Sequence, residues 1–233
     1  MYFINWERKI TKTKFGNNLV VVKRNKSFTR FRQFILIFCF TLISICSCNP
    51  AHPPEIGKKI LENEGFHSRN KLKLIGINSP KLFSITENEI VEEFIEGGNL
   101  YTCFNSEKPE VLALEVGKIT GKLHQNGMVF IDNKCQNFLV TKERELIRID
   151  LGFIQKSDSI FSQSMDIGSF LASIIDLDPN LYRLVEKEFL IGYKGTTNKK
   201  IPYLSIILRN ILALGFVYSH RNMIKNMLNK HYG

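Results

Sequence analysis

The chain has 233 residues, of which 44% are hydrophobic, 23% are charged and 11% are aromatic. This composition is typical of a folded protein and excludes a disordered or collagen-like chain. The five cysteines form no CxxC pair, and three of them lie in one apolar run, so the sequence indicates neither a zinc site nor a disulfide framework.

The formal net charge of +10 is concentrated at the two ends of the chain. Residues 1–33 hold nine Lys and Arg against one acid, residues 34–188 hold sixteen against twenty-one, and residues 189–233 hold seven against none. Basic ends can bind an acidic macromolecule or a lipid headgroup surface, or they can be solvated faces that keep the protein in solution.

The first expected element is a hairpin over Lys9–Arg24, because two β-prone segments flank the turn Gly16-Asn17-Asn18. The run Phe34–Cys48 then has fifteen residues without a charge, fewer than the ~20 that cross a bilayer. It also begins too deep in the chain for a signal peptide. We therefore expect a buried or interfacial helix, with a membrane anchor and a cleaved signal peptide as open alternatives.

The later segments change from strands to helices along the chain. The expected elements are a helix over Glu55–Ile75, strands on both sides of Thr86-Glu87-Asn88, a helix over Pro109–Asn126, short strands in Val129–Val140 and Leu146–Ile149, and mainly helices after Ser164.

Three polar residues have a spacing that points to chemistry. Asp132 and Asn137 are five residues apart, and Asp150 follows thirteen residues later, after an expected strand pair. A hairpin between them brings the three oxygen-bearing side chains to one end. Phosphoryl transfer from ATP uses such a cluster, because Mg²⁺ prefers oxygen ligands and a carboxylate orients the attacking hydroxyl.

These residues resemble the catalytic loop (Asp-x4-Asn) and the metal-binding loop (here Asp150-Leu151-Gly152) of the protein-kinase-like superfamily. The resemblance is to its small atypical members: the KEOPS-complex kinase, RIO-type kinases and the lipopolysaccharide kinase group. Leu123-His124 and the segment VEEFIEG at 91–97 are similar to the KEOPS-complex kinase, and Asp166 matches a residue that bonds the backbone of the catalytic loop.

The resemblance implies an α+β, two-lobed protein-kinase-like fold without a long activation segment. Residues 1–96 would form a β-rich N-lobe that contains the apolar insert 34–48, and residues 97–233 a mainly helical C-lobe. Lys23, after three valines, resembles the strand lysine that contacts ATP phosphates. Its helix partner would be Glu64, or else Glu62.

The implied function is an ATP- and Mg²⁺-dependent phosphotransferase, similar to atypical serine/threonine protein kinases. Asp132 would orient the acceptor hydroxyl, and Lys134 would neutralise charge on the transferred phosphate or remain a solvated loop residue. Asn137 and Asp150 would hold Mg²⁺. The backbone around Glu93, Phe94 and Ile95 would bind adenine, and Lys23 with Glu64 would bind the phosphates.

The sequence departs from the superfamily in that no GxGxxG precedes Lys23, and Phe130-Ile131-Asp132 stands in place of His-Arg-Asp. The acceptor can be a protein, a sugar or a lipid. Two alternatives stay open: a membrane-associated sugar or lipid kinase, and a nucleotide-binding pseudokinase. We expect a cytoplasmic protein, with membrane association through residues 34–48 as a variant of that expectation.

Overall fold

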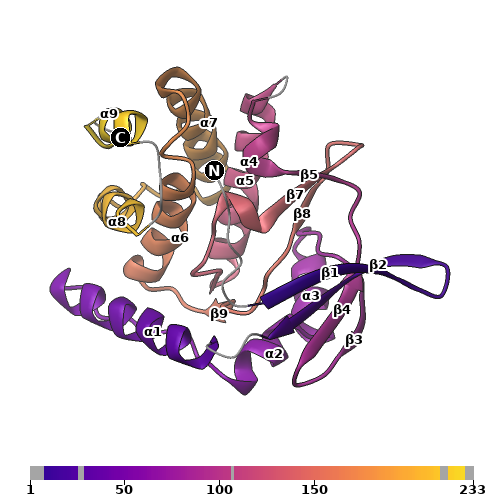
Figure 1. Cartoon of the computed structure of the whole chain (residues 1–233). Helices are drawn as coiled ribbons and strands as arrows, with labels where there is room; N and C mark the ends of the chain where they lie inside the picture. Colours follow the sequence, from indigo (N-terminus) through magenta and orange to yellow (C-terminus); the bar gives the residue numbers. More distant parts are fainter. Residues whose placement is uncertain (1–7, 26–28, 106–107, 216–219, 229–233) are drawn as a thin grey trace.

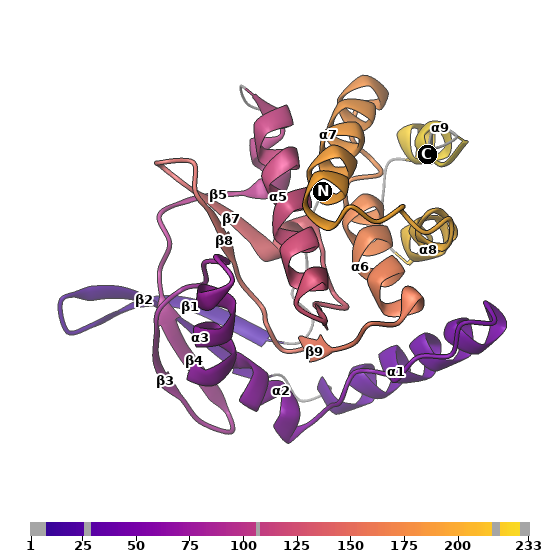
Figure 2. The same ribbon diagram turned by 180° about the vertical axis from the view of Figure 1, so that it is seen from behind.

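A computed structural model describes residues 8–25, 29–105, 108–215 and 220–228. The fold has a small lobe built on a β-sheet and a larger helical lobe, joined by the chain that leaves β4 (Figure 1). The reverse view in Figure 2 shows the same division into two lobes. The predicted α+β, two-lobed kinase-like fold class is confirmed.

The small lobe contains an antiparallel sheet with strand order β1-β2-β4-β3. Its strands are β1 (Arg8–Phe15), β2 (Asn18–Asn25), β3 (Leu82–Ile85) and β4 (Glu89–Glu93). Phe15 pairs with Asn18 across a two-residue turn in which Gly16 has a φ of 59°. Glycine adopts this left-handed conformation without steric strain, and the predicted hairpin is confirmed.

The predicted single helix over Glu55–Ile75 is wrong, because two short helices occupy this segment. They are α2 (Lys58–Glu64) and α3 (Phe66–Leu74), separated by Gly65. Gly65 has a ψ of 178°, which is extended backbone, and glycine is among the weakest helix formers. The break ends α2 at Glu64, so the chain turns directly after this carboxylate.

The apolar run lies in α1 (Thr29–Cys46), a helix of 18 residues. One side of α1 packs against the helical lobe, where the ring of Phe40 meets that of Phe161 edge-on at 4.9 Å between centroids. Within the described ranges, no helix is both long enough and apolar enough to cross a membrane.

The helical lobe holds most of the hydrophobic core. Its helices are α4 (Leu100–Cys103), α5 (Pro109–Gln125), α6 (Ile160–Ser173), α7 (Pro179–Thr197), α8 (Leu204–Ala213) and α9 (His220–Leu228). Gly117 of α5 and Gly192 of α7 let these two helices cross closely, since a Cβ on either glycine would clash with a backbone carbonyl of the other helix. The helix predicted over Pro109–Asn126 and the helices predicted after Ser164 are confirmed.

Further short strands, β5 to β9, flank the loops that follow the small lobe in the chain. They are β5 (Gly97–Asn99), β6 (Met128–Val129), β7 (Phe138–Thr141), β8 (Leu146–Arg148) and β9 (Gln155–Lys156), arranged in two small sheets, β5-β7-β8 and β6-β9. A single 3₁₀ turn at Cys135–Asn137 precedes β7. Because β5 pairs with β7 of the larger lobe, we propose that the lobe boundary lies between residues 96 and 97.

Candidate active site

Asp132 and Asn137 lie side by side at the entrance to β7. The Asn137 side-chain amide donates a hydrogen bond of 2.8 Å to the carbonyl of Asp132, and its nitrogen is 3.4 Å from Asp132 Oδ2. Ile131, directly before Asp132, has a φ of 63°. A β-branched residue in this region is strained, and strained backbone concentrates at functional sites.

Asp150 is held next to this pair by the backbone and by Arg148. The Arg148 guanidinium donates to the carbonyl of Asp132 at 2.9 Å and to that of Asp150 at 3.3 Å. The N–H of Ile149 donates to the carbonyl of Asn137 at 2.9 Å. Asp150 also has a positive φ, of 60°. The structure therefore brings together the two loops that carry the three predicted metal and hydroxyl residues.

Arg148 is a site residue that sequence reasoning missed. Its guanidinium stacks on the rings of Phe130 at 4.2 Å and Phe138 at 5.0 Å, and only 1% of the residue is exposed. Burial lowers the pKa of Arg148, although Asp132 and Asp150 favour its charged form. The available signal was an arginine inside an otherwise apolar strand, two residues before a predicted metal ligand.

Lys134 binds the Asp132 carboxylate with its ammonium group. Lys134 Nζ is 2.8 Å from Oδ1 and 2.9 Å from Oδ2, and the Asp132 side chain is 18% exposed. The carboxylate therefore remains accessible while its charge is balanced.

Lys23 is buried beneath the sheet of the small lobe with Glu92, which sequence reasoning also missed. Lys23 Nζ is 2.5 Å from Glu92 Oε1, and these side chains are 7% and 3% exposed. Val21 pairs with Glu92 and Lys23 with Ile90 across β2 and β4, so Lys23 and Glu92 are diagonal neighbours on one face.

Arg69 connects this ion pair to Glu64, the predicted helix partner. Its Nη2 is 2.8 Å from Glu92 Oε2 and 3.3 Å from Glu64 Oε2, and Glu64 is fully buried. Arg69 also donates to the carbonyl of Pro80 at 2.6 Å. Glu64 thus belongs to a buried network of two cations and two carboxylates, which joins β2, β4, α2 and α3.

Asp150 contributes to the electrostatics of Lys23. Burial lowers the pKa of Lys23, but Glu92, Glu64 and Asp150 together outweigh burial and raise the pKa above its ordinary value. Burial by itself would raise the pKa of Glu92. The positive charges of Lys23 and Arg69 outweigh this effect, so the pKa of Glu92 lies below its ordinary value. Lys23 is therefore held as a cation by its neighbouring carboxylates.

The predicted hinge leads directly from β4. Glu93 donates its N–H to the carbonyl of Lys81, and Phe94 donates its N–H to the carbonyl of Leu19, so both donors are used inside the protein. Among the described residues, the N–H of Ile95 has no hydrogen-bond acceptor. Of the three predicted adenine-binding positions, Ile95 is the one with a backbone donor available to a ligand.

A buried aspartate in α6 fixes the backbone of the predicted catalytic loop. Asp166 Oδ2 accepts a hydrogen bond of 2.8 Å from the N–H of Phe130 and lies 3.0 Å from Nε2 of His124. His124 reaches Tyr193 through its other ring nitrogen, also at 3.0 Å. The predicted bond from Asp166 to the loop backbone is confirmed, and His124 supports it from α5.

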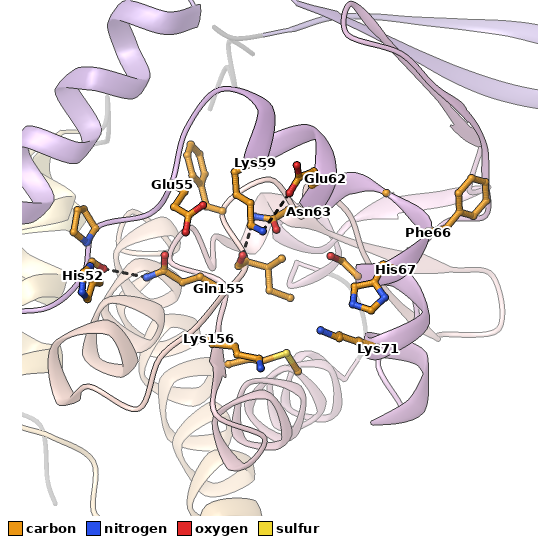
Figure 3. Close-up of a pocket in the computed structure, with 16 residues that line it drawn as sticks. His52, Glu55, Lys59, Glu62, Asn63, Phe66, His67, Lys71, Gln155 and Lys156 are labelled. Carbon is orange, nitrogen blue, oxygen red and sulfur yellow. Dashed lines mark hydrogen bonds and ion pairs between the residues drawn. The ribbon is translucent and has the colours of Figure 1, made fainter.

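A large cavity lies between α2, α3 and the segment 152–156. It has a volume of about 840 Å³, and His67, Lys71 and Lys156 are among the side chains around it (Figure 3). Asn63 joins the cavity to the metal-binding loop, because its amide donates to the carbonyls of Gly152 and Ile154 at 2.8 Å each. Of the predicted site residues, Glu62, the alternative helix partner of Lys23, lines this cavity, whereas Lys23, Glu64 and the three polar residues of the two loops do not.

A smaller cavity, of about 400 Å³, lies at the hinge. It is lined by residues 93–96 and by Thr141, Lys142 and Glu143 from the turn between β7 and β8. The predicted adenine-binding segment therefore borders a hollow that opens beside the larger lobe.

The donor set suits Mg²⁺ shared with a nucleotide. In the part of the chain that the structure describes, no three His, Cys, Asp or Glu side chains form a group that could hold a metal ion on their own. Mg²⁺ is commonly bound by one or two carboxylates together with phosphate oxygens and water. The two predicted ligands, the carboxylate of Asp150 and the amide oxygen of Asn137, fit that mode.

Two lobes with a buried strand lysine, a hinge and paired Asp-x4-Asn and Asp-Leu-Gly loops define a protein-kinase-like molecule. No protein-family model matches the chain. Among curated proteins, the chain is 32% identical over 122 residues to the "KEOPS complex subunit Bud32" of Pyrococcus abyssi, covering 49% of this chain and 55% of that protein. These relatives are atypical protein-kinase-like proteins, so the predicted resemblance to the KEOPS-complex kinase is confirmed.

Two further relatives extend the similarity. The "EKC/KEOPS complex subunit bud32" of Dictyostelium discoideum is 30% identical over 156 residues, which are 62% of this chain and 61% of that protein. A "Probable bifunctional tRNA threonylcarbamoyladenosine biosynthesis protein" of Methanospirillum hungatei is 28% identical over 161 residues, which are 66% of this chain and 28% of that protein. The chain thus spans less than two thirds of each relative. The similarity supports an atypical kinase-like role.

Proposed function

We propose that the chain is an ATP- and Mg²⁺-dependent phosphotransferase that moves the γ-phosphate to a hydroxyl group. The observation that carries the proposal is the joining of the two loops. Arg148 bonds the carbonyls of both Asp132 and Asp150, while Asn137 bonds Asp132. Asp150 is also one of the carboxylates that raise the pKa of Lys23.

Each residue then has one task in the transfer. Asn137 and Asp150 would hold Mg²⁺, and the bound ion would neutralise phosphate charge. Asp132 accepts a hydrogen bond from the acceptor hydroxyl and orients it, and Lys134 balances the charge of this carboxylate. Lys23, fixed in the buried network with Glu92 and Glu64, presents a cation to the phosphates without reorganisation during transfer. The N–H of Ile95 donates to adenine.

The acceptor is proposed to be a serine or threonine hydroxyl of a protein. The names of the relatives refer to KEOPS complexes and to tRNA threonylcarbamoyladenosine biosynthesis, so we propose protein partners of the KEOPS type and a cytoplasmic location. A sugar or lipid acceptor at a membrane surface is the second candidate, favoured by the apolar outer side of α1. A pseudokinase would bind the nucleotide without turning it over.

Turnover of radiolabelled ATP in the presence of Mg²⁺ tests the proposal. Wild-type protein should release or transfer the γ-phosphate, and Asp150→Ala should abolish this activity while keeping the melting temperature. Asp158→Ala is the matched control, since Asp158 is an exposed aspartate eight residues further along the chain, and it should retain full activity. Equal activity of Asp150→Ala and wild type would refute the assignment, and nucleotide binding without turnover in wild type would identify a pseudokinase.

A further inference from the structure

The outer side of α1 is apolar between residues 34 and 46, the part whose side chains the structure describes. Phe34, Phe38, Leu42 and Ile45 recur at helical spacing and are 61%, 58%, 50% and 60% exposed, and Ile35 beside them is 45% exposed. The remaining exposed positions between 34 and 46 are two cysteines, Cys39 and Cys46. Figures 1 and 2 both show α1 along one edge of the molecule, below α6 and β9.

The described part of α1 is apolar on its outward side as well as on its inward side. A surface helix normally directs its polar side chains outward. In α1 the inward side carries Phe40 and a fully buried serine, Ser44, whose hydroxyl donates to the carbonyl of Thr41 at 2.8 Å. The outward side between residues 34 and 46 carries no charged side chain. A continuous exposed apolar surface of this kind marks a contact with a protein or a membrane.

The charge of the surrounding sequence favours a membrane over a protein as the partner of this surface. No acid occurs between Glu7 and Glu55, whereas nine Lys and Arg do. Two of them, Arg30 and Arg32, fall at the start of α1, and its first turn contains no acid. Cations at a helix N-terminus oppose the helix dipole, so helix stability does not explain them. The headgroups of an anionic bilayer would attract these cations, and its hydrocarbon interior would accept the apolar side chains next to them.

We propose that α1 docks on an anionic lipid bilayer and lies in the plane of its surface, with Phe34, Ile35, Phe38, Leu42 and Ile45 in the headgroup–acyl boundary. The length of α1 agrees with this orientation, because no described helix can span the membrane. The proposal does not rest on phosphotransfer. Membrane docking requires only that the exposed apolar side of α1 and the cations near the start of α1 contact the same bilayer surface.

Flotation of the purified full-length chain with lipid vesicles tests this inference. Wild-type protein should float with vesicles that contain phosphatidylglycerol, remain unbound to vesicles of phosphatidylcholine alone, and be released by high salt. Phe38→Glu combined with Leu42→Glu should weaken binding at least about tenfold. Leu74→Glu is the matched control, since Leu74 is 86% exposed but lies on α3, and its binding should equal that of wild type.

Two outcomes would overturn the proposal. One is equal flotation of wild type and the double variant, with circular dichroism showing both folded. The other is a concentration-dependent dimer in light scattering that dissociates in the double variant, without lipid binding by wild type, because a second copy of the chain would then cover α1. Asp150→Ala should float like wild type, so a failure of the phosphotransfer proposal is recognised separately.

Discussion

Lys23 on β2 and Glu92 on β4 form a buried ion pair, with 2.5 Å between Nζ and Oε1. Glu92 uses its second oxygen for Arg69, which also holds Glu64. Four charges in a nearly dry environment are stable only as a set, since each depends on its neighbours for compensation. The lysine assigned to the phosphates is therefore positioned by two carboxylates from different elements.

Replacing Glu92 by Gln should lower the free energy of unfolding by about 3–5 kcal/mol, because Lys23 and Arg69 would lose a buried counter-charge. Urea unfolding measures the change. Glu89→Gln is a matched control on the same strand, since Glu89 pairs with Arg24 of β2 where the two side chains are 32% and 61% exposed. Glu89→Gln should lower the free energy of unfolding by less than about 1 kcal/mol. Equal losses for the two variants would contradict the buried network.

The same pair predicts how stability depends on pH. The pKa of Glu92 is lowered from 4.5, so its contribution is present above that value and is lost as the pH falls through the lowered pKa. The pKa of Lys23 is raised from 10.5, so its contribution is present below that value and is lost as the pH rises through the raised pKa. Urea unfolding followed between about pH 7 and about pH 3 should show a smaller acid loss in Glu92→Gln than in wild type. Parallel curves would count against this attribution.

Asp166→Ala should destabilise the fold by about 2–4 kcal/mol, because the N–H of Phe130 and the ring of His124 would lose a buried acceptor. Turnover should fall as well, since Asp132 lies two residues after Phe130. Asp178→Ala is the control. The Asp178 side chain accepts a hydrogen bond from the N–H of Asn180 at the exposed start of α7. Its loss should lower the free energy of unfolding by about 1 kcal/mol and leave turnover unchanged. Thermal unfolding and ATP turnover of both variants check this prediction.

Thiol labelling should separate Cys135 from the cysteines of the apolar run. Burial raises the pKa of the Cys135 thiol well above its ordinary value, and the side chain is fully buried, so it should resist a thiol reagent at neutral pH. Cys39, Cys46 and Cys48 are exposed and should react quickly. Mass spectrometry of the labelled chain measures both rates. Rapid labelling of Cys135 in the folded protein would show that the catalytic loop is not packed as described.

The sequence predicted the parts of the fold that depend on short-range patterns. The turn at Gly16-Asn17 and the strand pair between Asn137 and Asp150 were predictable, because turn residues and apolar runs are local signals. The break at Gly65 was not, since one glycine inside a helical pattern is often tolerated. Glu92 and Arg148 escaped notice because a charged residue in a strand gains its role from partners on distant elements.

We propose that Asn137 and Asp150 hold Mg²⁺ together with the phosphates of ATP, beside Asp132, which orients the acceptor hydroxyl. Isothermal titration of a non-hydrolysable ATP analogue, with and without Mg²⁺, tests it most directly. Wild-type protein should bind the analogue at least about tenfold more tightly with Mg²⁺, which corresponds to about 1.4 kcal/mol. Asp150→Ala and Asn137→Ala should lose this difference. Equal affinity of wild type with and without Mg²⁺, or an undiminished Mg²⁺ effect in Asp150→Ala, would contradict the account.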